Sequence, residues 1–340
     1  MKRTILYVVL AFIVAPIFVS CYQSHKKKLD LAYALVESRP DSALALMKHI
    51  DQEGLSKEEM AKYALTYYIA QDKSGLDLDN DSLIRIAYDW YEGHQEDSLY
   101  VLCLNYMGKF YLLVDSMEQA KSCLEKAYFI SDSLHKMNVK RLVLDKLIEV
   151  EEQLEPYKAL RYAKDMLKMY DSMANVTIYN KVAARLRLGE NFFYVGSLQH
   201  ALEEERKAYR MAMKAGDSNL LSYVRQNLSS TFEEMGEKDS CLYYARLAYD
   251  LNAANRFSCL LTFASAYISV DSLNQAFSLL NQALPKTAED RYSVFYIQSQ
   301  AAMKAHDFKS AKSFSDSAYH YLEDMYRTAL QGKAAYYTSF

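Results

Sequence analysis

The residues that most often carry out catalysis are scattered along this sequence of 340 residues. Histidine could serve as a general base or a metal ligand, but its seven positions (25, 49, 94, 135, 200, 306 and 320) share no His-x-His or His-Glu-x-x-His spacing. No glycine-rich phosphate loop and no Gly-x-Ser-x-Gly nucleophile elbow occurs. Adjacent acids such as Glu151 and Glu152 are commoner on a solvated helix face than in an acid/base pair. We therefore expect a protein that is not an enzyme and that has neither a metal nor a cofactor.

One cysteine is placed for a covalent modification. Lys2 and Arg3 precede an apolar run over residues 5–19, which is shorter than the roughly 18 residues that a spanning helix needs. This order is typical of a secretory signal peptide, which we place at residues 1–20. The segment Phe18-Val19-Ser20-Cys21 resembles a bacterial lipobox and implies lipid attachment at Cys21. Ordinary cleavage after a small residue, or an uncleaved anchor, is the alternative.

A short polar segment follows the predicted lipid site. Residues 21–28 end in Lys26, Lys27 and Lys28, and we interpret them as a basic tether between the membrane and the first helix. Lysines beside a bilayer gain about 1 kcal/mol each from anionic lipid, although a merely solvated linker would have the same composition. The chain resembles lipoproteins of Bacteroidetes, whose surface-exported members carry acids after the cysteine. A basic tether therefore favours a lipid-anchored protein of the cell envelope that faces the periplasm.

Four further cysteines lie outside the signal segment, at 103, 123, 241 and 259. An exported protein could oxidise them, with three possible connectivities. However, two open the first helices of the expected hairpins and two lie near the start of second helices, and antiparallel hairpins place starts against ends. We expect buried thiols that act as small packing residues.

A ladder of small residues organises the rest of the chain. Five of them are each followed twelve positions later by a second small residue and seven after that by an alanine, namely Gly108, Gly189, Ser229, Ala264 and Ser299, then Ala120, Ala201, Cys241, Ala276 and Ala311, then Ala127, Ala208, Ala248, Ala283 and Ala318. Two helices can pack closely in a hairpin only where neither carries a bulky side chain at the crossing. Only 9 Gly and 4 Pro occur. The sequence therefore predicts an all-α stack of helical hairpins.

The residues around the small-residue ladder resemble a known repeat family. Tyr106-Met107-Gly108-Lys109-Phe110-Tyr111 and Leu188-Gly189-Glu190-Asn191-Phe192 resemble the tetratricopeptide repeat. The resemblance implies an α-solenoid of about seven to eight hairpins wound into a right-handed superhelix. Second helices are expected around residues 43, 83, 120, 159, 201, 241, 276 and 311. We assign residues 29–98 to divergent hairpins, 99–320 to regular repeats, and 321–340 to a C-terminal helix that is either a cap or a truncated unit.

Asp-Ser dipeptides recur where second helices should begin, at residues 41, 81, 115, 239 and 271. Both side chains can accept hydrogen bonds from the amides of a first helical turn, and an aspartate also interacts favourably with the positive end of the helix dipole. We therefore expect these dipeptides to cap the second helices.

The resemblance also implies a concave groove lined by the first helices. Transferred onto this chain, the family's groove positions include Asn105, Lys109, Glu190, Phe193, Tyr194, Tyr223, Gln226, Tyr296 and Gln300. The Lys and Asn pattern with which some relatives clamp a terminal carboxylate is absent, because the corresponding positions are Lys109, Ile148, Glu190, Ser230, Ser265 and Gln300. A mixed surface of aromatic, amide and acidic groups suits a protein or peptide segment, with Phe193, Tyr194 and Tyr223 as anchors. Packing between adjacent units is the alternative role for each aromatic.

The overall charge limits the kind of partner. The formal net charge is −3, and no Lys/Arg cluster follows residue 28, so we expect no nucleic-acid binding. The sequence favours a membrane-tethered scaffold that binds a protein or peptide. The alternatives are a sensor module of an envelope signalling system and an outer-membrane assembly factor.

Overall fold

The computed structural model describes residues 26–76, 78, 81–93, 98–135, 137–251 and 253–338. Side chains are described up to residue 328, except at 138. The predicted signal peptide and Cys21 lie outside the described residues. Within them, every regular element is an α-helix.

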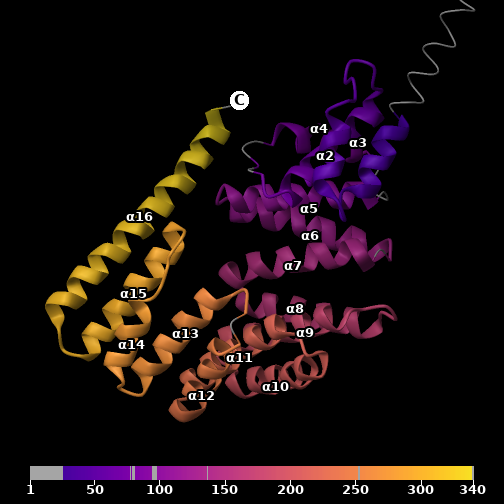
Figure 1. Ribbon diagram of the computed structural model, residues 1–340. Coiled ribbons are helices and arrows are strands. Elements are labelled where there is room, and N and C mark those ends of the chain that lie inside the picture. The colour runs from indigo at the N-terminus through magenta and orange to yellow at the C-terminus, as the bar shows by residue number, and fades with distance from the viewer. Residues whose placement is uncertain are drawn as a thin grey trace, which may run out of the picture. The chain divides into compact units, whose positions relative to one another are not determined.

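A helix at residues 26–35 is the first described element, and fifteen labelled helices follow it (Figure 1). Their bounds are α2 Pro40–Met47, α3 Lys57–Lys73, α4 Ser82–Tyr91, α5 Ser98–Leu113, α6 Met117–Ser133, α7 Met137–Leu154, α8 Pro156–Ser172, α9 Ile178–Tyr194, α10 Leu198–Ala215, α11 Ser218–Glu234, α12 Lys238–Tyr249, α13 Arg256–Ser269, α14 Leu273–Leu280, α15 Ala288–Lys304 and α16 Phe308–Thr338. All eight residues that the sequence placed near the start of second helices fall in the first four residues of an even-numbered helix. The alternation of first and second helices is therefore confirmed.

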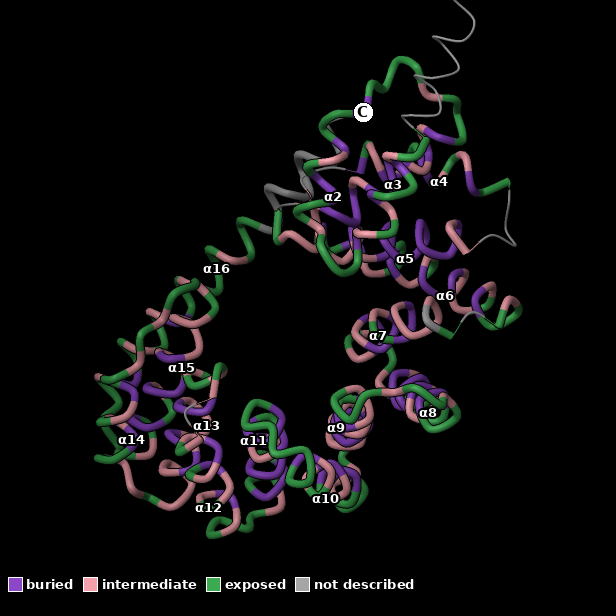
Figure 2. The backbone as a smooth tube through the Cα atoms, turned by 45° about the vertical axis from the view of Figure 1, so that its right-hand side comes forward, coloured by how far each residue is buried: buried purple, intermediate pink, exposed green. Residues whose placement is uncertain are grey.

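The helices form two compact units. Unit 1 comprises the described residues up to 146 together with 332–338, and unit 2 comprises the described residues of 147–331. In unit 1, α5 packs against α6 and α3 against α4. In unit 2, α9 packs against α10, α11 against α12, and α13 against α14, while the first helices α9, α11 and α13 contact one another in turn. The buried residues lie along the faces where these helices meet (Figure 2).

The small-residue ladder forms the crossings of the hairpins. A Cβ added to Gly108 of α5 would lie 2.6 Å from Cγ of Leu124 on α6, so no side chain fits there. In unit 2 the hydroxyls of Ser229 and Ser299 donate across their hairpins to the carbonyl oxygens of Cys241 and Ala311, at 3.0 and 3.1 Å. These contacts join residues twelve apart, which is the spacing that the sequence predicted. Ala283 departs from the pattern, because α14 ends at Leu280, shortly before Pro285.

Each regular hairpin turns through the same backbone motif. The residue seven positions after the first small residue has a positive φ in every case: Asp115, Gly196, Gly236, Asp271 and His306. The next amide donates back to the carbonyl five residues earlier, as Ser116 does to Tyr111 and Glu237 does to Phe232, at 2.8 and 2.9 Å. This is a Schellman turn, which satisfies the last carbonyls of the first helix. The constant spacing of the small residues therefore extends to the turns of these hairpins.

The expected capping by Asp-Ser dipeptides is wrong. Ser116 and Ser272 are N-cap residues, but neither side chain makes a cap hydrogen bond. The Schellman turn holds ψ at 68° and 60° there, whereas the N-cap residues Ser56, Thr177 and Thr287, which do accept such a bond, have ψ between 151° and 169°. In two of the five dipeptides the aspartate instead takes the left-handed conformation of the turn, which Asp tolerates better than most residues.

Both ends of the repeat region differ from the sequence boundaries. Residues 26–28, which we assigned to the tether, already belong to a helix, because lysine is a good helix former and Leu29, Ala32 and Val36 are buried just beyond. At the other end, residues 321–338 do not form a separate helix but continue α16 from Phe308. No glycine or proline occurs between residues 308 and 331 to stop it.

The four described cysteines are thiols. Cys103, Cys241 and Cys259 are buried, and Cys123 is half-buried. Burial raises the pKa of Cys123 and of Cys259 to about 11, so both are protonated and unreactive near neutral pH.

Candidate functional site

In unit 1 the two predicted groove residues lie on α5. Asn105 is buried, and its Oδ1 has no hydrogen-bond partner. Lys109 is half-buried and forms a short ion pair with Asp72 of α3. Lys109 therefore joins two successive first helices.

In unit 2 the predicted aromatic residues lie on three first helices. Tyr194 of α9, Tyr223 of α11 and Tyr296 of α15 expose 59%, 50% and 47% of their surface. Phe193 is half-buried and packs edge-on against Tyr194, with ring centroids 6.1 Å apart. Gln300, one turn after Tyr296, is exposed. Because about half of the surface of each tyrosine is exposed, these rings can bury apolar area against a partner.

Gln226 of α11 lies between two first helices rather than in solvent. It is 8% exposed. Its Oε1 accepts hydrogen bonds from Ser258 and Thr262 of α13, at 2.6 and 3.4 Å, and its Nε2 donates to the carbonyl of Ser222 at 3.3 Å. The side-chain amide of Gln226 therefore links α11 to α13.

A polar cluster connects α7, α9 and α11. Asn191 donates to Glu152 at 2.9 Å, and Asn227 donates to Glu190 at 2.9 Å. Arg187 lies between the two acids, 3.5 Å from Glu152 and 3.7 Å from Glu190. A polar surface that extends over three consecutive first helices can hydrogen-bond an extended chain.

This cluster carries excess negative charge. Burial raises the pKa of Glu152, Arg187 opposes that effect, and the nearby Glu190 adds to it. The pKa of Tyr194 is also raised, first by desolvation and then by Glu152 and Glu190. Burial is the main cause of both shifts, and the carboxylates gathered around Arg187 add to it.

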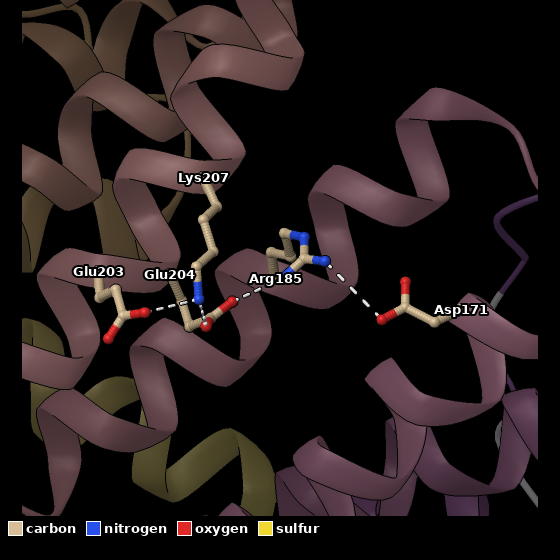
Figure 3. Close-up of polar contacts among 5 residues, drawn as sticks. All are labelled: Asp171, Arg185, Glu203, Glu204 and Lys207. Atoms are coloured by element: carbon tan, nitrogen blue, oxygen red, sulfur yellow. Dashed lines mark hydrogen bonds and ion pairs between the residues drawn. The ribbon is translucent and has the colours of Figure 1, made fainter.

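A second charged cluster lies on α8, α9 and α10, and the sequence did not predict it. Figure 3 shows Lys207 between Glu203 and Glu204, at 2.8 and 2.7 Å, and Arg185 between Glu204 and Asp171, at 2.8 and 3.7 Å. Each of these carboxylates has a cation beside it. A depression of about 470 Å³ adjoins the cluster. It is lined by Arg185, Lys207, Tyr209, Arg210, Met211, Met213 and Lys214.

Sequence reasoning also missed Glu205 of α10. It is 1% exposed, its Oε1 accepts from the Thr231 hydroxyl of α11 at 2.8 Å, and its Oε2 has no hydrogen-bond partner. Its position, sixteen residues after Gly189, corresponds to Leu124 in the Gly108 hairpin and to Leu280 in the Ala264 hairpin. The available signal was an acid at a position that leucine occupies in two other hairpins.

The described part of the chain also bears on metal binding and on membrane insertion. No group of three or more His, Cys, Asp or Glu side chains there could hold a metal ion. None of the helices described is both long and apolar enough to cross a membrane.

Comparison with known proteins bears on the fold. No protein-family model and no curated protein matches the sequence. Among solved structures, the apo form of RapI is 14% identical and covers 88% of this chain and 86% of its own, with a TM-score of 0.66. A Rap protein complexed with Competence and Sporulation Factor is 15% identical over 93% of this chain and 96% of its own, with a TM-score of 0.61. NprR in complex with its cognate peptide NprX is 16% identical over 86% and 87%, with a TM-score of 0.60. The fold is an all-α solenoid of tetratricopeptide-like hairpins.

Proposed function

We propose that this protein is a non-enzymatic scaffold that binds a protein or peptide segment along the first helices of unit 2. The observation that carries the proposal is the exposure of Tyr194, Tyr223 and Tyr296 on three first helices of one stack. Aromatic residues dominate the energetics of protein interfaces because they bury a large area with little loss of side-chain entropy. Two of the similar structures are complexes, one with Competence and Sporulation Factor and one with a cognate peptide, which supports a partner of this kind.

The surroundings of these tyrosines also support a polypeptide partner. The side chains of Glu190, Asn191 and Asn227 lie on α9 and α11, which also carry Tyr194 and Tyr223, and Glu152 lies on the preceding first helix α7. Such groups can accept from and donate to a peptide backbone, while the rings bury its side chains. Exposed aromatics alone would suit many ligands, but this combination favours an extended chain.

Replacing Tyr223 with alanine tests the surface. We expect crosslinking of the full-length protein to its partner in native membranes to fall by about tenfold, because a central aromatic anchor contributes on the order of 1–2 kcal/mol. Tyr157→Ala is the matched control, since Tyr157 is 76% exposed but lies on the second helix α8. An equal loss in both variants, or in neither, would remove Tyr223 as an anchor.

We further propose that the chain is anchored in the bacterial cell envelope through a lipid on Cys21 and faces the periplasm. Support comes from the sequence alone, through the basic start, the short apolar run and the lipobox-like Phe18-Val19-Ser20-Cys21. Cys21→Ala should abolish labelling with a radioactive fatty acid and leave the precursor unprocessed. Cys123→Ala, which removes a thiol within α6, should label normally. Labelling that persists in Cys21→Ala would rule out the anchor.

A further inference from the structure

Carboxylates gather where the first helices of unit 2 end. Glu152 lies two residues before the end of α7, and Glu233 and Glu234 are the last two residues of α11. Glu190 lies one turn before the end of α9. The C-terminal end of a helix is the negative end of its dipole, so an acid there costs about 0.3–1 kcal/mol rather than stabilising the helix. We call Glu152, Glu190, Glu233 and Glu234 the acidic strip.

Few cations within unit 2 compensate the acidic strip. Arg187 serves both Glu152 and Glu190. Burial and the neighbouring Glu234 raise the pKa of Glu233. Lys304 lowers it, but its effect is the smallest of the three. The Lys304 ammonium is also engaged elsewhere, since it pairs with Asp271 at 2.9 Å and donates to the Ile268 carbonyl at 2.5 Å. Within the described residues, no hydrogen bond or ion pair reaches the side-chain carboxylate of Glu233 or of Glu234. In the cluster of Figure 3, by contrast, every carboxylate has a cation beside it.

Acids that oppose the dipole of their own helix and lack full compensation are not placed there for stability. Violations of such local rules concentrate at functional sites. The strip shares α9 and α11 with Tyr194 and Tyr223, and Tyr194 follows Glu190 by one helical turn. A cation beside Glu190 would therefore lie near both a carboxylate and the ring of Tyr194, and both attract it.

We propose that the acidic strip selects a positively charged partner, a segment whose lysine or arginine side chains bind Glu190, Glu233 and Glu234 while its apolar side chains pack on Tyr194 and Tyr223. This inference rests on the proposed function and adds the partner's charge to it. With Glu152, the acidic strip spans the three helices α7, α9 and α11, which matches an extended segment with several cations. A single bound metal would require ligands clustered at one point, and no such cluster occurs in the described chain.

The test uses three pools of short peptides with identical random neutral positions and with lysine, glutamine or glutamate at every second position. Binding to the full-length protein in detergent is measured by fluorescence anisotropy. We expect the lysine pool to bind most tightly and to weaken as salt is added. Glu233→Gln combined with Glu234→Gln should weaken the lysine pool by about threefold to tenfold, since exposed ion pairs contribute 0.2–1 kcal/mol each. The matched control is Glu323→Gln with Asp324→Asn, an equally charged and exposed acidic pair on α16.

The outcomes separate the partner's charge from the proposed function. Equal binding of the lysine and glutamine pools, with both lost in Tyr223→Ala, would overturn the charge preference and leave the binding surface standing. A loss of affinity as large in the α16 control as in the strip variant would also overturn it. Failure of all three pools to bind would count against both proposals.

Discussion

Replacing Glu205 with glutamine is expected to raise the free energy of unfolding of unit 2 by about 3 kcal/mol at pH 8 and to change it little at pH 4. The pKa of Glu205 is raised from 4.5 to about 7, chiefly by burial. The Thr231 hydroxyl opposes this effect and Glu190 adds to it. Each unit of difference in pKa between the folded and unfolded chain corresponds to about 1.4 kcal/mol, which sets the size of the effect.

The direction follows from which state holds the proton. Between pH 4.5 and about 7 the folded chain keeps the Glu205 proton while the unfolded chain has released it. The stabilisation by this proton is therefore complete below pH 4.5 and is lost as the pH rises through 7. Glutamine resembles the protonated acid, because its side-chain carbonyl can still accept the hydrogen bond from Thr231. The stability of the variant should therefore not fall between pH 4.5 and about 7.

Urea unfolding at several pH values, followed by circular dichroism, would measure the difference between wild type and Glu205→Gln. Glu203→Gln is the control, since Glu203 precedes Glu205 by two residues and is exposed. A stability difference between wild type and Glu205→Gln that does not change with pH would contradict the expectation. The control should show no comparable gain at pH 8.

The second large effect is expected at the hairpin crossing in unit 1. Gly108→Ala should lower the free energy of unfolding by about 2 kcal/mol, because the added Cβ would lie 2.6 Å from Cγ of the fully buried Leu124. In a Leu124→Ala background the same change should be neutral or stabilising. There the clash is gone, and alanine is favoured over glycine in a helix by about 1 kcal/mol.

A double-mutant cycle on Gly108 and Leu124 isolates this contact. Thermal unfolding of the four proteins would give the coupling free energy. Gly54→Ala is the control, since nothing lies within 4 Å of its added Cβ, and it should stabilise by about 0.5 kcal/mol. If Gly108→Ala has the same effect with Leu124 present or absent, steric exclusion does not explain the ladder.

The sequence predicted the helices far better than it predicted their turns. Small residues at a fixed spacing determine where two helices cross, so the positions of the second helices could be derived from Gly108, Ser229 and their counterparts. The turns could not, because Asp115 and Asp271 were interpreted by their capping chemistry and not by the backbone conformation they adopt. Gly196 and Gly236, at the same position in their hairpins, were the available indication of a positive φ.

The proposed binding surface could be predicted only in part from the sequence. A repeat pattern indicates which helix face a residue occupies, and it placed Tyr194 and Tyr223 on exposed first-helix positions. It does not indicate hydrogen-bond partners on the neighbouring repeat. For that reason Gln226 was grouped with the groove residues although its amide bonds to α13, and Glu205 was not noticed. Such contacts between repeats join side chains 26 to 37 residues apart, which no local pattern specifies.

The hydrogen bonds between first helices determine how binding of a partner would affect the rest of the stack. Asn227 is already bonded to Glu190, and Gln226 to Ser258, so the atoms nearest the proposed surface also join successive hairpins. A bound segment that forms a hydrogen bond with one of these groups must therefore break a hydrogen bond between two hairpins. Partner binding and the stiffness of the stack are then thermodynamically linked, so that binding would change how readily the hairpins move against one another.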